Sequence, residues 1–298
     1  MENILVVLDG SDADEQAVAQ AVKIIDRTEG RLHFLMTVYD QIEEMHKYVG
    51  FDNYKDIKQS LLDRAETKLR LLTDQFNVNF SSSMTWGKRW YLPVVDKARK
   101  MEADLIIKVV GDRHSRLVDF LQTPEDWHLL RDASCPLWLI SDQNADIQEV
   151  IAAVSTLDES PEHRALDERV TGQAQRLAGA LSKPLWVVSV LPDFNAMAVP
   201  MAYVPPVPGQ SVLWHETAAE AKARSQQKLE LMLDRLRVQP DRIEMLTGRV
   251  DRALAETVDT HGLLVIGSAA NRGLAGKFIG NSSEKVLRYL KADMLVVH

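Results

Sequence analysis

The sequence predicts an α/β protein made of two tandem units, each with a parallel sheet covered by helices on both faces. Short apolar runs rich in branched residues alternate with stretches of helical periodicity along the whole chain. Consecutive parallel strands require crossover connections, which these helical stretches supply. After the polar segment Ser141–Asp146 the same series begins again, which indicates an internal duplication.

The first half contains five expected strands and four expected helices. The strands are Ile4–Leu8, Leu32–Val38, Asn79–Thr85, Asp104–Val110 and Leu137–Ile140. The helices are Asp14–Arg27, Leu61–Phe76, Pro93–Met101 and Glu125–Arg131, with a long loop over Tyr39–Ile57. We place the first domain at residues 1–142.

The second half, placed at residues 147–298, repeats this order. Its strands are Val150–Val154, Leu185–Val190, Ile243–Leu246, Leu263–Ile266 and Met294–Val297. Its helices are Pro161–Leu181, Trp214–Leu236 and Val250–Thr260. A loop over Leu191–Leu213 is rich in proline and apolar residues, so it must cover part of the fold, a partner or a ligand.

Composition excludes several classes of protein. The chain of 298 residues is 46% hydrophobic and 26% charged, as in soluble globular proteins, and its net charge of -8 argues against nucleic-acid binding. A single cysteine, Cys135, excludes an internal disulfide and fits a reducing compartment. The N-terminus enters a strand directly and no apolar run is long enough to span a membrane, so we expect a cytoplasmic location.

The stretch Gly267–Glu284 is the strongest candidate for a ligand site. A strand that ends in glycine and passes through small residues into a helix presents unpaired backbone N–H groups to an anion. Simple helix capping is the alternative, because Asn281 and Glu284 have the spacing of a capping box.

The spacing of Gly267 and Gly280 resembles the nucleotide loop of universal stress proteins, with Ala270 and Asn281 at two family positions. The runs Thr123–Arg131 and Phe278–Glu284 are similar to tandem members of the E type. This resemblance implies the strand order 3-2-1-4-5 in each half. It also implies two separate five-stranded sheets, related by a pseudo-two-fold axis as in a family dimer, while a further homodimer stays open.

In nucleotide-binding members of that family, an Asp after the first strand and the glycine loop after the fourth strand act together. The first half keeps the acid, Asp9, but places a branched residue, a carboxylate and an amide where the glycines belong. These residues are Val109, Asp112 and Gln122. The second half keeps the glycines but has Ser155 in place of the acid. We therefore expect ATP to bind weakly if at all.

The candidate ligand site lies in the second half and combines small polar residues with two glycines. It consists of Ser155, Gly267, Ser268, Gly280, Asn281, Ser282 and Ser283. We expect no metal site, because neither His114 nor His128 has a second ligand at metal-binding spacing. The loop contains neither a nucleophile elbow nor a Walker lysine, so the sequence predicts no catalytic residue.

The resemblance therefore indicates a non-catalytic binding or regulatory protein of the stress response. Three alternatives stay open: a weak binder or hydrolase of ATP or another adenine nucleotide, a binder of an amphipathic lipid-like or nucleotide-linked molecule, and a ligand-free scaffold. The amphipathic alternative arises because the apolar loop and the glycine loop both follow the carboxyl ends of expected strands, where ligands bind in sheets of this kind.

Replacing Gly280 with Val should block binding of whatever ligand co-purifies with the protein, because a side chain would fill the space in which the backbone approaches an anion. Gln122→Val, at the matching place in the first half, is the control. Native mass spectrometry measures the retained ligand. Equal loss in both variants would show that the predicted location in the second half is wrong.

Overall fold

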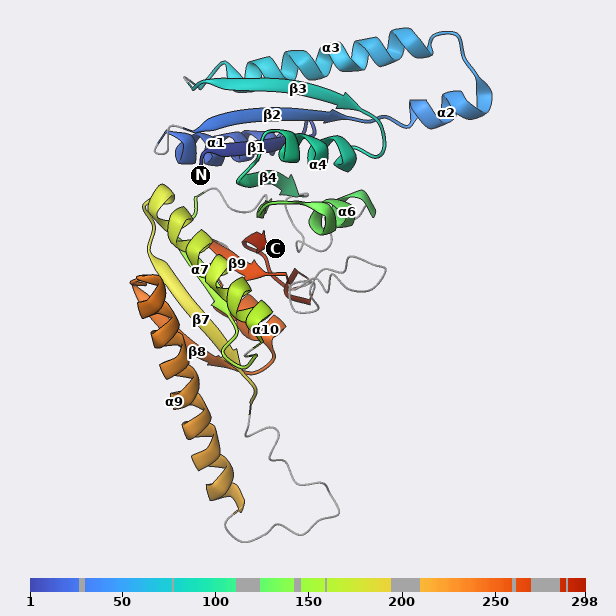
Figure 1. Cartoon of the computed structure of the whole chain (residues 1–298). Helices are drawn as coiled ribbons and strands as arrows, with labels where there is room; N and C mark the ends of the chain where they lie inside the picture. The colour runs from blue at the N-terminus through green and yellow to red at the C-terminus, as the bar shows by residue number, and fades with distance from the viewer. Residues whose placement is uncertain are drawn as a thin grey trace.

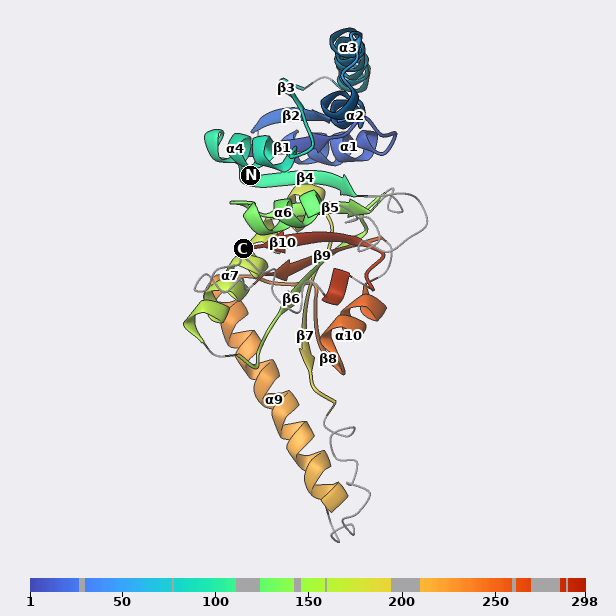
Figure 2. The same cartoon turned by 90° about the vertical axis from the view of Figure 1, so that its right-hand side faces the viewer.

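The computed structural model describes residues 1–26, 30–76, 78–110, 124–141, 146–158, 160–193, 210–258, 261–268, 285–287 and 289–298, without the side chains of 124–126 and 210–217. Its ten strands form one continuous sheet in the order β3-β2-β1-β4-β5-β10-β9-β6-β7-β8. Figures 1 and 2 show this sheet running through the length of the molecule with helices on its two faces.

The strands of each half are parallel and follow the expected order. The first half contains β1 (Asn3–Leu8), β2 (Arg31–Val38), β3 (Phe80–Trp86), β4 (Leu105–Val110) and β5 (Leu137–Ser141). The second half contains β6 (Glu149–Val154), β7 (Leu185–Leu191), β8 (Arg242–Thr247), β9 (Gly262–Gly267) and β10 (Asp293–Val297). The predicted order 3-2-1-4-5 is thus confirmed in both halves.

The expectation of two separate sheets is wrong, because β5 pairs with β10 in antiparallel orientation and joins the halves edge to edge. Trp138 lies opposite Leu295, and Leu139 pairs with Met294 as Leu137 pairs with Val296. Leu137 and Met294 are equivalent, since they pair with Ile106 of β4 and Leu264 of β9 at matching positions. The register across the seam is therefore that of a pseudo-two-fold axis through Trp138 and Leu295.

Helices of each half cover both faces of the sheet. The described helices are α1 (Asp14–Ile25), α2 (Ile42–Val49), α3 (Tyr54–Thr73), α4 (Tyr91–Lys100), α6 (Pro124–Asp132), α7 (Pro161–Leu181), α9 (Gln210–Leu236) and α10 (Val250–Thr257). Buried residues of α1, α3, α7 and α9 pack in one core cluster. Those of α4, α6 and α10 pack in another, on the opposite face. None of the helices in the described residues is long and apolar enough to cross a membrane.

The expected loop over Tyr39–Ile57 contains α2 and the beginning of α3, so that prediction is wrong. Asp40 accepts a hydrogen bond from the backbone of Ile42 at 2.9 Å, which favours a helix start. Glu43 accepts one from Trp86 of β3 at 2.6 Å and so attaches the helix to the sheet. Ile42, Met45 and Val49 of α2 have helical spacing, but the helix is only eight residues long and none of its residues is buried, with Tyr48 86% exposed.

The outer edges of the sheet are β3 and β8. On β3, Ser81 and Ser83 hydrogen-bond the two ring nitrogens of the buried His33 at 2.7 and 2.8 Å. Burial lowers the pKa of His33 to about 4, so the ring is neutral at physiological pH. On β8, Arg242 pairs with Glu244 at 2.7 Å.

A buried carboxylate holds the seam between the halves together. Asp293 of β10 accepts a hydrogen bond from the indole N–H of Trp138 at 3.0 Å and one from the backbone of Ser141 at 2.9 Å. Asp293 and Trp138 are both fully buried. If the carboxylate is removed, these buried N–H groups cannot hydrogen-bond water instead and are left without an acceptor.

Replacing Asp293 with Ala should lower the free energy of unfolding by about 2–4 kcal/mol, because two buried N–H groups lose their acceptor. Urea denaturation measures the change. The same substitution at Asp234, an exposed carboxylate of α9, is the control and should change the stability by less than about 0.5 kcal/mol. Equal effects of the two changes would show that Asp293 does not stabilise the seam.

Candidate functional site

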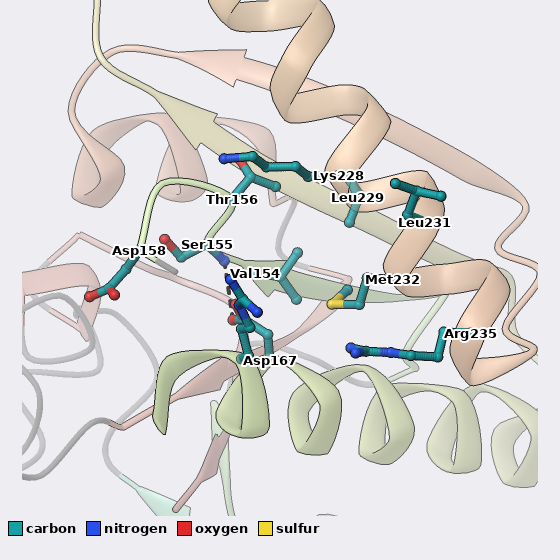
Figure 3. Close-up of a pocket in the computed structure, with 11 residues that line it drawn as sticks. Val154, Ser155, Thr156, Asp158, Asp167, Lys228, Leu229, Leu231, Met232 and Arg235 are labelled. Carbon is teal, nitrogen blue, oxygen red and sulfur yellow. Dashed lines mark hydrogen bonds between the residues drawn. The ribbon is translucent and has the colours of Figure 1, made fainter. Parts of the chain in front are cut away.

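A cavity of about 360 Å³ lies in the second half, between the carboxyl end of β6, the start of α7 and the C-terminal part of α9. Figure 3 shows its walls, which combine hydroxyl, charged and apolar side chains. The lining residues are Val154, Ser155, Thr156, Asp158, Arg164, Asp167, Lys228, Leu229, Leu231, Met232 and Arg235. Its volume is in the range of small-molecule sites, and the carboxyl ends of parallel strands are where such sites form.

Ser155 stands at the cavity because it is the first residue after β6. Its backbone N–H donates to Oδ1 of Asp167 at 3.1 Å, so a carboxylate of α7 fixes the turn after the strand. Thr156 shares a buried hydrogen bond with Ser189 of β7 at 3.1 Å. Ser160 caps α7 by accepting from the backbone of His163, and Pro161 occupies the first helical position. These contacts hold the polar wall in place.

The charged groups of the cavity are partly paired with neighbours outside it. Hydrogen bonds from Ser160 hold the pKa of Asp158 below its usual range, and His163 lies 3.0 Å from the same carboxylate. Arg235 forms an ion pair with Glu168 of α7. Burial raises the pKa of Asp167 to about 6, despite the N–H group that it accepts.

The rest of the lining makes the cavity amphipathic. Leu229, Leu231 and Met232 of α9 present apolar surface beside Val154, while Arg164 and Lys228 add two cations. A ligand with an anionic group and an apolar body matches these walls.

Of the seven candidate residues, Ser155 and two others, Gly267 and Ser268, lie in the described part of the chain. Gly267 ends β9 next to the end of β6, and a Cβ there would lie 2.6 Å from Cγ of Leu166 on α7. Close packing of a helix on the strand therefore explains this glycine without a ligand. Ser268 is buried, and its backbone donates to Val297 at 2.7 Å.

The other four candidates, Gly280, Asn281, Ser282 and Ser283, lie outside the described residues. The same holds for the capping residues Thr123 and Glu284, for Asp112, Gln122 and His114, and for the part of the apolar loop over residues 194–209. His128 is described and stacks on Tyr91, with ring centroids 4.8 Å apart, which is a packing role. Within the described residues no cluster of side chains has the composition of a metal site.

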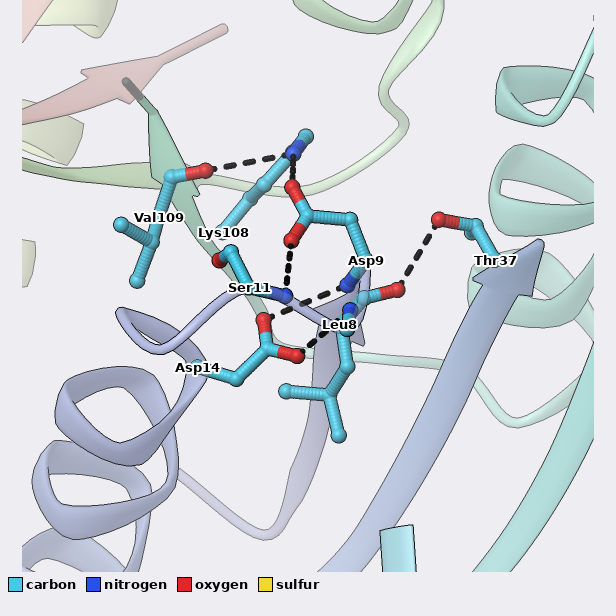
Figure 4. A network of polar contacts seen from close by, with 8 residues as sticks. Leu8, Asp9, Ser11, Asp14, Thr37, Lys108 and Val109 are labelled. Atoms are coloured by element: carbon cyan, nitrogen blue, oxygen red, sulfur yellow. Dashed lines mark hydrogen bonds and ion pairs between the residues drawn. The ribbon is translucent and has the colours of Figure 1, made fainter. Parts of the chain in front are cut away.

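In the first half, Asp9 at the carboxyl end of β1 takes part in an internal ion pair. Lys108 of β4 is buried, and its ammonium lies 3.4 Å from Oδ2 of Asp9 and 5.1 Å from the ring centre of Trp90. Figure 4 shows this network. Ser11 donates to the other oxygen of Asp9 at 3.0 Å. Both carboxylate oxygens of Asp9 are therefore engaged within the protein.

Asp14, the first residue of α1, completes the network. Its carboxylate accepts from the backbone N–H groups of Asp9 and Gly10, at 3.2 and 2.8 Å. Burial and then the charge of Asp9 raise the pKa of Asp14 to about 7. Partial burial also acts on Asp9, but Lys108 and Ser11 outweigh it and hold the pKa of Asp9 below its usual value.

The register shows how the halves differ. Asp9 and Ser155 are each the first residue after the central strand. Val7 lies two residues before Asp9 and pairs with Lys108. Ala153 lies two residues before Ser155 and pairs with Ile266, so Lys108 and Ile266 are equivalent. An acid and a base in the first half thus correspond to a hydroxyl and an aliphatic residue in the second. The sequence did contain one signal, a lysine within the apolar run Leu105–Val110.

Gly267→Ala should destabilise the protein by about 1–3 kcal/mol, because the added methyl group overlaps Leu166. In the double variant Gly267→Ala/Leu166→Ala, the smaller side chain at position 166 leaves room for the added methyl group. Leu166→Ala should therefore lower the free energy of unfolding less in the Gly267→Ala protein than in the unaltered protein. Urea denaturation of the four proteins measures this coupling. Additive effects would contradict the packing role of Gly267.

Comparisons with known proteins agree with this architecture. Universal stress protein E of Photorhabdus laumondii is 26% identical over 313 residues, which cover 99% of this chain and 94% of that protein. Universal stress protein E of Escherichia coli K12 is 25% identical over 312 residues, covering 99% and 93%. The crystal structure of a functionally unknown protein from Pseudomonas aeruginosa PAO1 has a TM-score of 0.69 at 22% identity, covering 100% and 92%.

The profile of the universal stress protein family matches two segments, residues 1–141 and 157–298. The first segment contains the five strands β1 to β5, and the second, which begins after β6, contains the four strands β7 to β10. Two consecutive matches account for the repeated order of elements that the sequence predicts. The chain therefore belongs to the universal stress protein family, as a member with two tandem domains.

Proposed function

We propose that this protein acts in the stress response as a non-catalytic binding or regulatory protein, and that a small amphipathic anion binds in its second half. The observation that carries the proposal is the cavity beside Ser155. Its walls offer hydroxyl groups and cations on one side and apolar side chains of α9 on another. We further propose that the protein works in the cytoplasm, with domains at residues 1–142 and 147–298.

The contrast between the two halves supports a single site. In the first half, Lys108 and Ser11 already occupy both carboxylate oxygens of Asp9, the residue on which nucleotide contact depends in the family resemblance. In the second half, Ser155 carries no charge and a cavity is present. One ligand per chain is the stoichiometry that this arrangement favours.

The chemistry of the cavity favours binding over catalysis. Its hydroxyl groups, Ser155 and Thr156, have no histidine within the lining to act as their base, and Thr156 is bonded to Ser189. We therefore favour binding without hydrolysis over ATP hydrolysis as the function of this cavity. The glycine loop residues Gly280, Asn281, Ser282 and Ser283 stay in the proposal as additional donors to the anionic group.

Native mass spectrometry of protein purified without added ligand tests the proposal. We expect a retained small molecule at a ratio of one per chain. Adenylate masses would support a nucleotide ligand, lipid-like masses would support the amphipathic anion, and a clean mass of the chain alone would contradict binding and favour the scaffold.

A charge reversal in the cavity tests where the molecule sits. Lys228→Glu should abolish retention, because it places a carboxylate beside the ligand's anionic group. Lys222→Glu makes the same change on an exposed position of α9 outside the lining and should retain the ligand. Loss in both variants, or in neither, would contradict the proposed location.

A further inference from the structure

Asp167 of α7 has a feature that the other charged groups of the cavity lack. Its side chain lines the cavity, yet the residue is only 8% exposed. Oδ1 accepts the backbone N–H of Ser155 at 3.1 Å, while Oδ2 has no hydrogen-bond partner among the described residues. This oxygen belongs to a side chain on the cavity wall and has no donor from the protein, so it is the one that a bound ligand can meet.

We propose that Asp167 determines recognition of the anion, by taking up one proton when the ligand binds and donating it in a hydrogen bond to an anionic oxygen. This inference rests on the proposed function. It adds that binding is linked to pH, because a carboxylate on the wall repels an anion whereas a carboxylic acid can donate to it. The bond to Ser155 is kept in both forms.

The charges around Asp167 come from three elements. The turn after β6 carries Asp158, which lies next to His163 of α7. α7 also supplies Arg164 to the lining and Glu168, which pairs with Arg235 of α9. α9 adds Lys228. The cations attract an anion at every pH of interest, so the carboxyl group of Asp167 is the group on this wall whose protonation we expect to change the affinity.

The acidity of Asp167 makes proton uptake feasible near neutral pH. The pKa of Asp167 is raised to about 6, mainly by burial and also by the charge of Asp158, while the N–H of Ser155 and the charge of His163 act in the opposite direction. At pH 7 roughly one such group in ten is protonated, compared with about one in a thousand for an unperturbed aspartic acid. An anion favours the protonated form, so its affinity must rise as pH falls through this range and level off below it.

The first half provides a matched control. Asp14 is also a buried aspartate beside the turn after a central strand, and the pKa of Asp14 is raised to about 7. Both of its oxygens, however, accept backbone N–H groups, from Asp9 and Gly10. Asp14 thus has no oxygen free of a donor and lies outside the cavity lining, so its replacement should not change the pH dependence of binding.

Binding of anilinonaphthalene sulfonate between pH 5 and pH 8 tests the inference. This probe has an apolar body, and its sulfonate keeps one charge over that range, so any linked proton must bind the protein. We expect the dissociation constant of the unaltered protein to fall by about tenfold or more from pH 8 to pH 5. Near-ultraviolet circular dichroism at each pH confirms that the fold is intact.

Asp167→Asn should bind the probe tightly and without pH dependence, because the amide oxygen can accept from Ser155 while the amide N–H donates to the anion. Asp14→Asn and His163→Gln should both keep the slope. A slope that survives in Asp167→Asn, or disappears in His163→Gln, would overturn the assignment. Affinity of the unaltered protein that does not change with pH would overturn it as well.

Calorimetry in two buffers of different ionisation enthalpy gives an independent count that needs no variant. We expect uptake of close to one proton per bound probe at pH 7 and near zero at pH 5. Release of protons, or no exchange at pH 7, would contradict the inference. Absence of probe binding at every pH would instead contradict the proposed cavity itself, and so the two failures can be told apart.

Discussion

The antiparallel pairing of β5 with β10 is the constraint on which the rest of the structure depends. It turns two parallel sheets into one, and it fixes which edges of the halves are buried. Asp293 reinforces the seam by accepting hydrogen bonds from Trp138 and Ser141 of the other half. Because the register is centred on Trp138 and Leu295, equivalent positions of the two halves can be compared residue by residue. The difference between Asp9 with Lys108 and Ser155 with Ile266 becomes visible only through that comparison.

A duplicated fold allows its copies to specialise. In the first half, charges at the carboxyl end of the sheet neutralise one another, and Asp9 is committed to Lys108 and Ser11. In the second half the corresponding positions are uncharged, and the space between α7 and α9 stays open as a cavity. Both halves nevertheless keep a buried aspartate, Asp14 or Asp167, that holds the turn after the central strand. The turn is a shared structural element, whereas the surroundings decide what its aspartate can do.

Local patterns were sufficient to predict most of the fold, because strands such as β1 and helices such as α7 have a clear apolar period. The seam could not be predicted in this way, since pairing between two edge strands far apart in the chain has no local signature. Helix α2 was missed because it is short and mostly polar, although its few apolar residues, Ile42, Met45 and Val49, have helical spacing. In the site, Ser155 was found by its place after a strand, but Lys228 and Met232 reach the cavity only through the packing of α9 on α7, and Asp167 shows its role only in contact with Ser155.

The remaining open edges, β3 and β8, lie at opposite ends of the ten-stranded sheet. Since β5 and β10 satisfy each other within one chain, strand-to-strand growth could start only at these ends. Joining β3 of one copy to β8 of another would be a heterologous contact, which repeats without closing and produces a fibre. Both edge strands carry polar side chains: on β3, serines bound to His33 of β2, and on β8, Arg242 paired with Glu244. Pairing of the two domains within one chain thus removes the inner edges from such contacts.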